Sequence, residues 1–141
     1  MTSRSSKVSK PRKLRTVAIT ATASGTYTIG VTGAITVGQL DTVGITVDDG
    51  GSTTSTITLT APVLSGVETL NLTANDNVVV SALTSATALT KVTVAGAKTS
   101  SITTGALALN ANTVIDASSA TGAVTVDASL STGNGLQIIG S

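Results

Sequence analysis

Residues 64–72 read LSGVETLNL, and three further nine-residue windows align with this stretch at regular intervals along the chain. They are ATALTKVTV at 86–94, ALNANTVID at 108–116 and LSTGNGLQI at 130–138. The seventh position is apolar in all four windows, and the ninth is apolar in three of them. A fixed period of about 20–50 residues indicates a repeat architecture, in which neighbouring units bury one another's apolar faces.

Two positions of this alignment are predicted to form buried columns. The first column contains Leu70, Val92, Val114 and Leu136, and the second contains Leu72, Val94 and Ile138, with Asp116 as its one polar member. Stacked strands lie about 4.8 Å apart, so equivalent residues of successive coils are expected to lie directly above one another.

A second apolar series lies half a period away from the first. It contains Ile35, Val37, Ile57, Leu59, Val78, Val80, Ile102, Val124 and Val126. Around it, apolar and polar residues alternate with the period of two that is typical of strands, as in residues 56–60. The sequence therefore predicts an all-β, parallel β-helix-like solenoid of four to five coils of about 22 residues. An antiparallel β-sandwich is the alternative.

The composition favours the solenoid over the sandwich. The chain has 28 Thr, no Phe, Trp, Cys or His, and Tyr27 as its one aromatic residue. β-Branched side chains favour strands, whereas an ordinary core uses aromatic rings as filler. Thin stacked coils need small residues in register instead. Apolar runs are too short for a membrane-spanning helix, so no membrane span is expected.

The chain divides into a basic N-terminal arm, residues 1–15, and a β-repeat domain, residues 16–141. Regular coils are expected over 64–141. Residues 16–60 fit the period less well and are predicted to form a cap or a hairpin that pairs 16–19 with 27–31.

Charge is distributed unevenly between these parts. Six of the eight basic residues are in the arm: Arg4, Lys7, Lys10, Arg12, Lys13 and Arg15. The remainder has two lysines and seven acids, a net charge of −5. The arm is interpreted as a solvated, disordered terminus or as a segment that docks on an acidic protein surface, including another copy of this chain. Nucleic acid is a less favoured partner, because no base-stacking aromatics accompany the charges.

The phrase in residues 64–72 resembles the GVETLNL motif of Thr/Ala-rich β-solenoid repeats in bacterial S-layer proteins and RTX-type adhesins. Residues 88–96 resemble the phrase that follows it there, and residues 114–118 and 126–129 resemble the V-DAS element of the same coils. The resemblance covers residues 64–141. It implies a secreted or surface-exposed scaffold without activity of its own.

Calcium-binding nonapeptides often follow such coils in that family. Here the turn at residues 133–139 has Gln137 at the position of the ligating Asp. A neutral amide is a weaker ligand for Ca²⁺ than a carboxylate, so no calcium is expected at this turn.

The remaining chemistry predicts a protein that is not an enzyme. Without His or Cys, a catalytic base must be a carboxylate or a lysine. Asp116 and Asp127 are half a coil apart, so we expect them on different faces, as corner residues that cap backbone N–H groups. Asp48 and Asp49 are weak candidates for a metal site in what is expected to be a turn. No catalytic residue and no cofactor is predicted.

These observations favour a structural role on the surface of a larger particle. The first hypothesis is a virion decoration, cement or fibre protein anchored through the basic arm, with other copies of itself and a major shell protein as partners. The alternative is an S-layer or adhesin-type lattice module that is secreted to the bacterial cell surface. A carbohydrate- or ligand-binding module is a third hypothesis.

Overall fold

Every regular element that the described residues form in the computed structural model is a β-strand. The structure describes residues 14–20, 25–30, 41–51, 55–83, 86–104, 113–132 and 135–140, with the backbone alone for 14–20. The strands are β1 Leu14–Thr20, β2 Gly25–Tyr27, β3 Thr42–Asp48, β4 Thr56–Leu59, β5 Thr69–Ala74, β6 Asn77–Val80, β7 Lys91–Gly96, β8 Ser100–Thr103, β9 Val114–Ala120, β10 Val124–Asp127 and β11 Gln137–Ile139. None of the described residues forms a helix of the length and apolarity that crossing a membrane requires.

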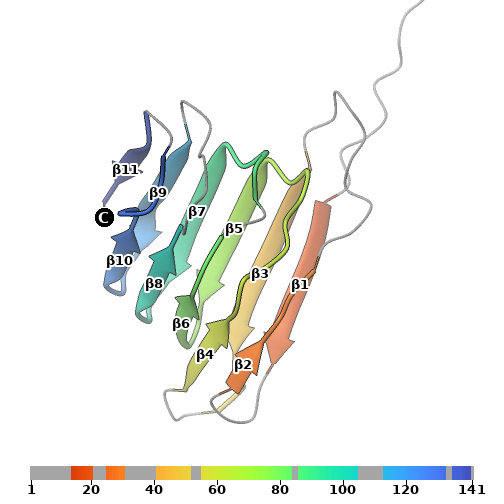
Figure 1. Ribbon diagram of the computed structural model, residues 1–141. Coiled ribbons are helices and arrows are strands. Elements are labelled where there is room, and N and C mark those ends of the chain that lie inside the picture. Colours follow the sequence, from red (N-terminus) through yellow and green to blue (C-terminus); the bar gives the residue numbers. More distant parts are fainter. Residues whose placement is uncertain are drawn as a thin grey trace, which may run out of the picture.

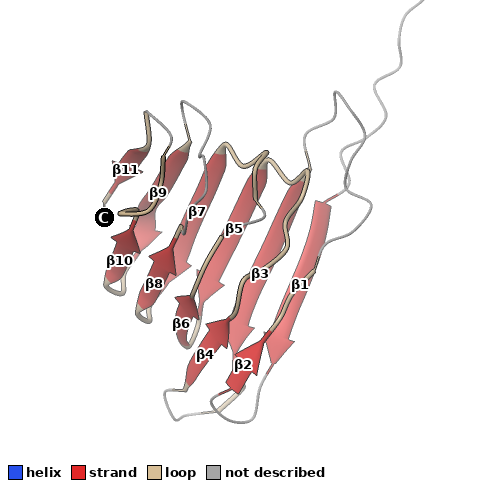
Figure 2. Ribbon diagram, viewed as in Figure 1, coloured by secondary structure: helices blue, strands red, loops and turns tan. Residues whose placement is uncertain are grey.

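The strands form two sheets, and the chain alternates between them. One sheet has the order β1-β3-β5-β7-β9-β11 and the other the order β10-β8-β6-β4-β2. All pairings between these strands are parallel. The result is a parallel β-solenoid of about four turns, with the first coil at one end and β10 and β11 at the other (Figures 1 and 2). The predicted fold class is confirmed, and the sandwich is excluded.

The core lies between the two sheets, in columns of apolar side chains. In the six-stranded sheet, Val43 pairs with Leu70 and Leu70 with Val92, and all three are buried. The neighbouring column of Ile45, Leu72 and Val94 is also buried. The predicted burial and stacking of Leu70 on Val92, and of Leu72 on Val94, is therefore confirmed. Burying each such side chain contributes about 1.5–3 kcal/mol.

The predicted columns are wrong beyond β7, because the register changes there. Val92 pairs with Ile115 instead of Val114, and Ile115 pairs with Ile138. Each of these two steps along the chain is one residue longer than the step from Leu70 in β5 to Val92 in β7. One additional residue moves a side chain to the opposite face of a strand.

Val114, Leu136 and Ile138 therefore differ from the prediction. Val114 lies between Lys91 and Gln137 on the outer face and is half-buried. Leu136 precedes β11 and packs partly against the core. Ile138 belongs to the column of Leu70 and Val92 and is 53% exposed, because no later coil among the described residues covers it.

The second apolar series forms the core face of the five-stranded sheet. Ile57 pairs with Val78, and Leu59 with Val80 and then Ile102. Val124 and Val126 continue the two columns, and Ser100 lies between Val78 and Val124. The predicted half-period offset is thus confirmed for these residues. Ile35 and Val37 lie outside the described residues.

The solenoid begins earlier than the regular repeat in the sequence. Residues 16–19 lie in β1, which pairs with β3, whereas Tyr27 lies in β2, which pairs with β4 in the other sheet. The predicted hairpin between these segments is therefore wrong. The steps from β1 to β3 and from β3 to β5 are several residues longer than the step from β5 to β7. These longer connections conceal the period.

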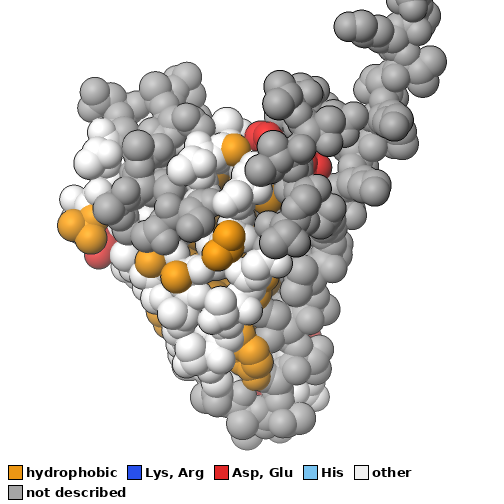
Figure 3. Space-filling view, turned by 45° about the vertical axis from the view of Figure 1, so that its right-hand side comes forward, with side chains coloured by type: hydrophobic (Ala, Val, Ile, Leu, Met, Phe, Trp, Pro, Cys, Tyr) orange, Lys and Arg blue, Asp and Glu red, His pale blue; other side chains and the backbone are white. Residues whose placement is uncertain are grey.

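The outward face of the sheets is rich in threonine and poor in charge. Thr46 and Thr73 stack in one outer column, and the Thr93 hydroxyl donates a hydrogen bond to Asn71 Oδ1 one coil earlier at 2.6 Å. Among the described residues on the face seen in Figure 3, charged side chains are few and the hydrophobic areas are separate from one another.

Candidate functional site

The predicted basic arm joins the body at one end of the solenoid. Arg4, Lys7, Lys10, Arg12 and Lys13 lie outside the described residues. Arg15 lies in β1, where its backbone pairs with Val43. Because β1 is the outermost strand of the six-stranded sheet, residues 1–13 are attached to the first coil.

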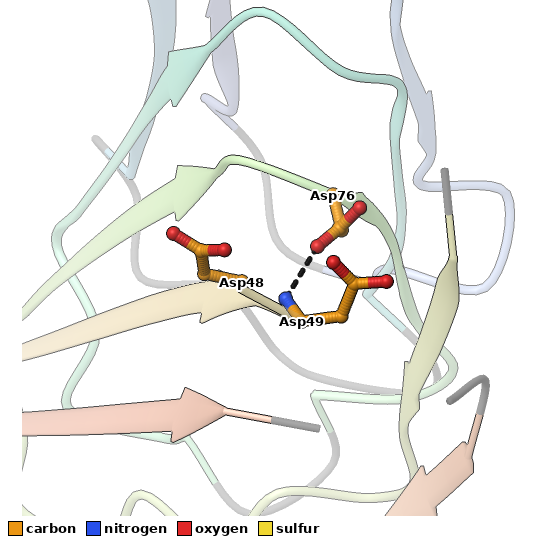
Figure 4. A group of neighbouring side chains, drawn as sticks. All are labelled: Asp48, Asp49 and Asp76. Atoms are coloured by element: carbon orange, nitrogen blue, oxygen red, sulfur yellow. Dashed lines mark hydrogen bonds between the residues drawn. The ribbon is translucent and has the colours of Figure 1, made fainter. Parts of the chain in front are cut away.

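The densest group of acidic side chains lies at a corner of the second coil. Asp48 ends β3, and Asp49 begins the turn that follows it. Val47 pairs with Ala74, so the next two residues of each coil, 48–49 and 75–76, occupy equivalent places in consecutive turns. This stacking brings Asp76 onto Asp49, and Figure 4 shows the three carboxyl groups at the corner. Their nearest oxygen atoms all lie within 4.8 Å of one another.

Hydrogen bonds join the two coils through the buried pair of Asp49 and Asp76. The Asp49 N–H donates to Asp76 Oδ2 at 2.5 Å, and the Ser55 N–H donates to Asp76 Oδ1 at 3.3 Å. Asp49 in turn accepts hydrogen bonds from the Ser55 hydroxyl at 2.5 Å and from the Gly51 N–H at 2.8 Å. The two carboxyl groups thus satisfy three backbone donors of the corner.

Asp48 is more accessible than Asp49 and Asp76 and makes hydrogen bonds on the outer side of the same corner. Its carboxylate accepts hydrogen bonds from the Gly50 N–H at 2.8 Å and from Asn75 Nδ2 at 3.1 Å. Bonds from an Asp side chain to the backbone two residues on are those of an Asx-turn.

The pKa of Asp49 is lowered, first by the hydrogen bond from the Ser55 hydroxyl and then by the one from the Gly51 N–H. Hydrogen bonds that favour the charged form stabilise the carboxylate. Lys98, at the equivalent position one coil beyond Asp76, adds a smaller electrostatic contribution in the same direction.

The corner has the donor chemistry of a cation site and the bonding of a structural lock. Carboxylate oxygens are ligands for hard cations, but Ca²⁺ takes about six to eight oxygens. Here three carboxyl groups converge, and each already accepts hydrogen bonds from the corner. The arrangement therefore supports a rigid connection between two coils. Sequence reasoning singled out Asp48 and Asp49 but missed Asp76, because the step from Asp49 to Asp76 is longer than the regular period of the sequence.

Asp116 and Asp127 lie in β9 and β10, in different sheets, as expected. Asp116 Oδ1 accepts hydrogen bonds from the Ser118 N–H and hydroxyl, and Asp127 Oδ1 accepts one from the Ser129 N–H. The pKa of Asp116 is lowered first by the hydrogen bond from the Ser118 side chain and then by the one from its backbone, and Ser129 lowers the pKa of Asp127 in the same order. The predicted capping of backbone N–H groups is confirmed, although Asp116 lies within a strand.

Lys91 pairs with Asp116 of the following coil, at 3.7 Å from Nζ to Oδ2. Glu68, in the coil before Lys91, accepts a hydrogen bond from the Asp41 N–H at 2.6 Å. Lys91 and Asp116 are both partly exposed, and such ion pairs contribute at most about 1 kcal/mol.

The fold places the chain in the class of parallel β-solenoids. Comparison of the sequence with protein-family models gives no match, and neither the curated proteins nor the solved structures contain a match.

Proposed function

We propose that this chain is a non-enzymatic structural protein that assembles on the surface of a larger particle, and that the particle is a virion. The observation that supports this role is the separation of charge along the solenoid. The arm, whose sequence contains six basic residues, leads into β1 of the first coil, and the rest of the chain has a net charge of −5. A basic segment on an acidic body is suited to an acidic partner surface, which it attracts over about the Debye length.

The solenoid supplies the rigid part of such an assembly. In the middle of the solenoid, β3, β5 and β7 pair in parallel, and their core residues are at most 2% exposed. The acidic corner locks two of these coils by side-chain hydrogen bonds. A body of this kind holds a docking arm at a fixed place on its first coil.

A lattice module of the S-layer or adhesin type is the second candidate. The phrase in residues 64–72 supports it, because this phrase opens coils in the repeats that it resembles, and here its last four residues begin β5. Both candidates use the same mechanism, in which a rigid repeat is attached to many equivalent sites of a shell.

Fractionation of the source material distinguishes the two candidates. Purified virions and purified cell envelopes are digested, and peptides of this chain are quantified by mass spectrometry. Enrichment in virions, in proportion to a major shell protein, is the expected result. Enrichment in the envelope supports the lattice module, and absence from both fractions contradicts a surface role.

Deletion of residues 2–13 tests the arm as the anchor. The deletion ends before β1, so the far-ultraviolet circular dichroism of the body should be unchanged. Binding of the purified variant to particles stripped of this protein should be lost. A control that replaces the same basic residues by Gln keeps the length of the arm and should also fail to bind. Retained binding by either variant rules out the arm as the anchor.

A further inference from the structure

The end of the solenoid that carries β10 and β11 exposes core residues. Leu130 is 61% exposed, Ile138 53% and Ile139 39%. Ile115, the partner of Ile138 one coil earlier, is 1% exposed. Among the described residues, no strand pairs with the outer edge of β10 or of β11.

A hollow of about 330 Å³ opens at this end, between the two sheets. It is lined by Ala117, Val124, Val126, Ile138, Ile139 and Gly140. Val124 and Val126 belong to core columns whose earlier members Val78, Val80 and Ile102 are fully buried. The hollow is therefore the place that one more coil would fill.

The opposite end of the solenoid also has free strand edges. β1 and β2 are the outermost strands of the same two sheets, and no strand of the described residues pairs with their outer edges. Tyr27 and Ile29 pack only partly against the core there. Because every pairing along the solenoid is parallel, a second copy shifted along the axis presents β1 to β11 in the same sense (Figure 1). The six-stranded sheet has one strand more than the five-stranded sheet at this end, so β2 of that copy lies one strand position further from β10 than a paired strand would.

We propose that the end formed by β10 and β11 is an interaction surface for the β1 and β2 end of a second copy of this chain. Such a contact is heterologous and builds open-ended stacks. It continues the six-stranded sheet from β11 to β1 of the next copy, pairs these two exposed edges and covers Ile138.

The distribution of charge favours this contact between opposite ends over a contact between two β10 and β11 ends. Beyond Lys98 the chain has no basic residue, and the acids of the last coils are Asp116 and Asp127. A copy that docks through β1 brings to this end the strand into which its basic arm leads. A symmetric contact between two β10 and β11 ends would bring the same acidic residues together, with no cation from the arm. Opposite charges at the two ends also steer the ends toward each other.

The inference concerns the purified chain alone and does not depend on the particle to which it is attached. The experiment is sedimentation velocity of residues 1–141 over a wide range of protein concentrations. The weight-average mass should rise past that of two copies with concentration, and it should fall when salt is added, because the arm contributes charge.

Ile138→Lys tests the surface itself. The side chain is half exposed, so the melting temperature of the variant should stay close to that of the parent. The protein concentration needed for stacking should rise about tenfold or more. Val63→Lys is the matched control, since Val63 is 38% exposed and lies on the flank between β4 and β5. It should stack like the parent chain. Leu130→Lys serves as a second variant if Ile138→Lys melts early.

Three results would overturn the proposal. They are a mass of one copy at all concentrations, a mass that stops at two copies, which indicates a symmetric dimer, and equal loss of stacking in Ile138→Lys and Val63→Lys. Because Ile138→Lys retains the arm, its attachment to particles should be normal. Loss of stacking is thus distinguishable from failure of the proposed anchoring role.

Discussion

Adjacent residues of β9 have opposite environments, which determines how the chain responds to substitution there. Ile115 is fully buried in the column of Leu70 and Val92, whereas Val114 is half-buried on the outer face beside Lys91. Burial of an ionised carboxylate without a partner costs far more than a protein can tolerate, so the group must become neutral or the fold must open. At the outer position the same group remains hydrated.

We therefore expect Ile115→Asp to unfold or aggregate the domain and Val114→Asp to change the urea midpoint only slightly. Chemical denaturation followed by circular dichroism provides the measurement. Equal effects of the two substitutions would show that the register between β7 and β9 is wrong.

The carboxyl groups of the corners make stability depend on acid pH. Asp49, Asp116 and Asp127 each have a pKa below the ordinary value of 3.8 in the folded protein. A lowered folded-state pKa adds stability that is complete above the unfolded value and is lost as the pH falls through the folded one. The free energy of unfolding should thus decline below about pH 4.

Asp49→Asn should reduce this decline, because an amide does not titrate. Urea midpoints at neutral pH and at about pH 3 give the comparison. Asp48→Asn is the matched control at the same corner, since it removes a more accessible carboxylate. If the stability of Asp49→Asn declined as steeply with falling pH as that of the parent chain, the lowered pKa of Asp49 would not be a cause of the decline.

At the scale of elements, the close stacking of corners restricts the residues that can occupy them. Gly96 ends β7 with a φ of 110°, and a Cβ at this position would overlap the carbonyl oxygen of Ala74 in β5. Gly50 also has a positive φ, of 69°, but no atom lies within 4 Å of the equivalent Cβ. At Gly96 the backbone of the preceding coil leaves no room for a Cβ, whereas at Gly50 the space is open.

Gly50→Ala should therefore cost about 1–2 kcal/mol, the penalty of a left-handed backbone. Gly96→Ala should cost clearly more, because the β7 corner must also move away from β5. Thermal unfolding of both variants measures the difference. Equal losses would indicate that the contact between Gly96 and Ala74 is relieved without cost.

The elements also explain which parts of the fold could be predicted from the sequence. The step from β5 to β7 has the same length as the period of the sequence. That period therefore places Leu70 on Val92 and Leu72 on Val94 correctly. Before β5 the coils are longer, and no fixed period reveals that β1 and β2 belong to the two sheets. Beyond β7 one extra residue precedes β9, and the register shifts again between Thr93 and Ala95.

The same reasoning accounts for the acidic corner. Asp48 and Asp49 are adjacent in the sequence and were evident candidates. Asp76 reaches them only through the pairing of Val47 with Ala74, which is a property of the longer second coil. In a solenoid, an error of one residue in coil length moves every later side chain to the opposite face.

At the scale of the whole molecule, a solenoid is a one-dimensional array in which each coil is stabilised by its neighbours. Coils in the middle have two neighbours, and terminal coils have one. The burial of side chains follows this rule. The core positions of β5 and β7 are at most 2% exposed, whereas the core positions of β10 and β11 are half-buried or exposed. Local opening should therefore cost least at the β10 and β11 end.

Amide hydrogen exchange of the dilute chain should accordingly be slowest in β5 and β7 and fastest in β11 and β10. Raising the protein concentration should slow exchange in β11 selectively if stacking pairs its edge with β1 of another copy, because paired amides exchange only after the contact opens. Ile138→Lys should retain the fast exchange at high concentration, and Val63→Lys should respond like the parent chain. Uniform exchange along the dilute chain would instead mean that the coils open as one cooperative unit, and that the exposed end is as stable as the middle.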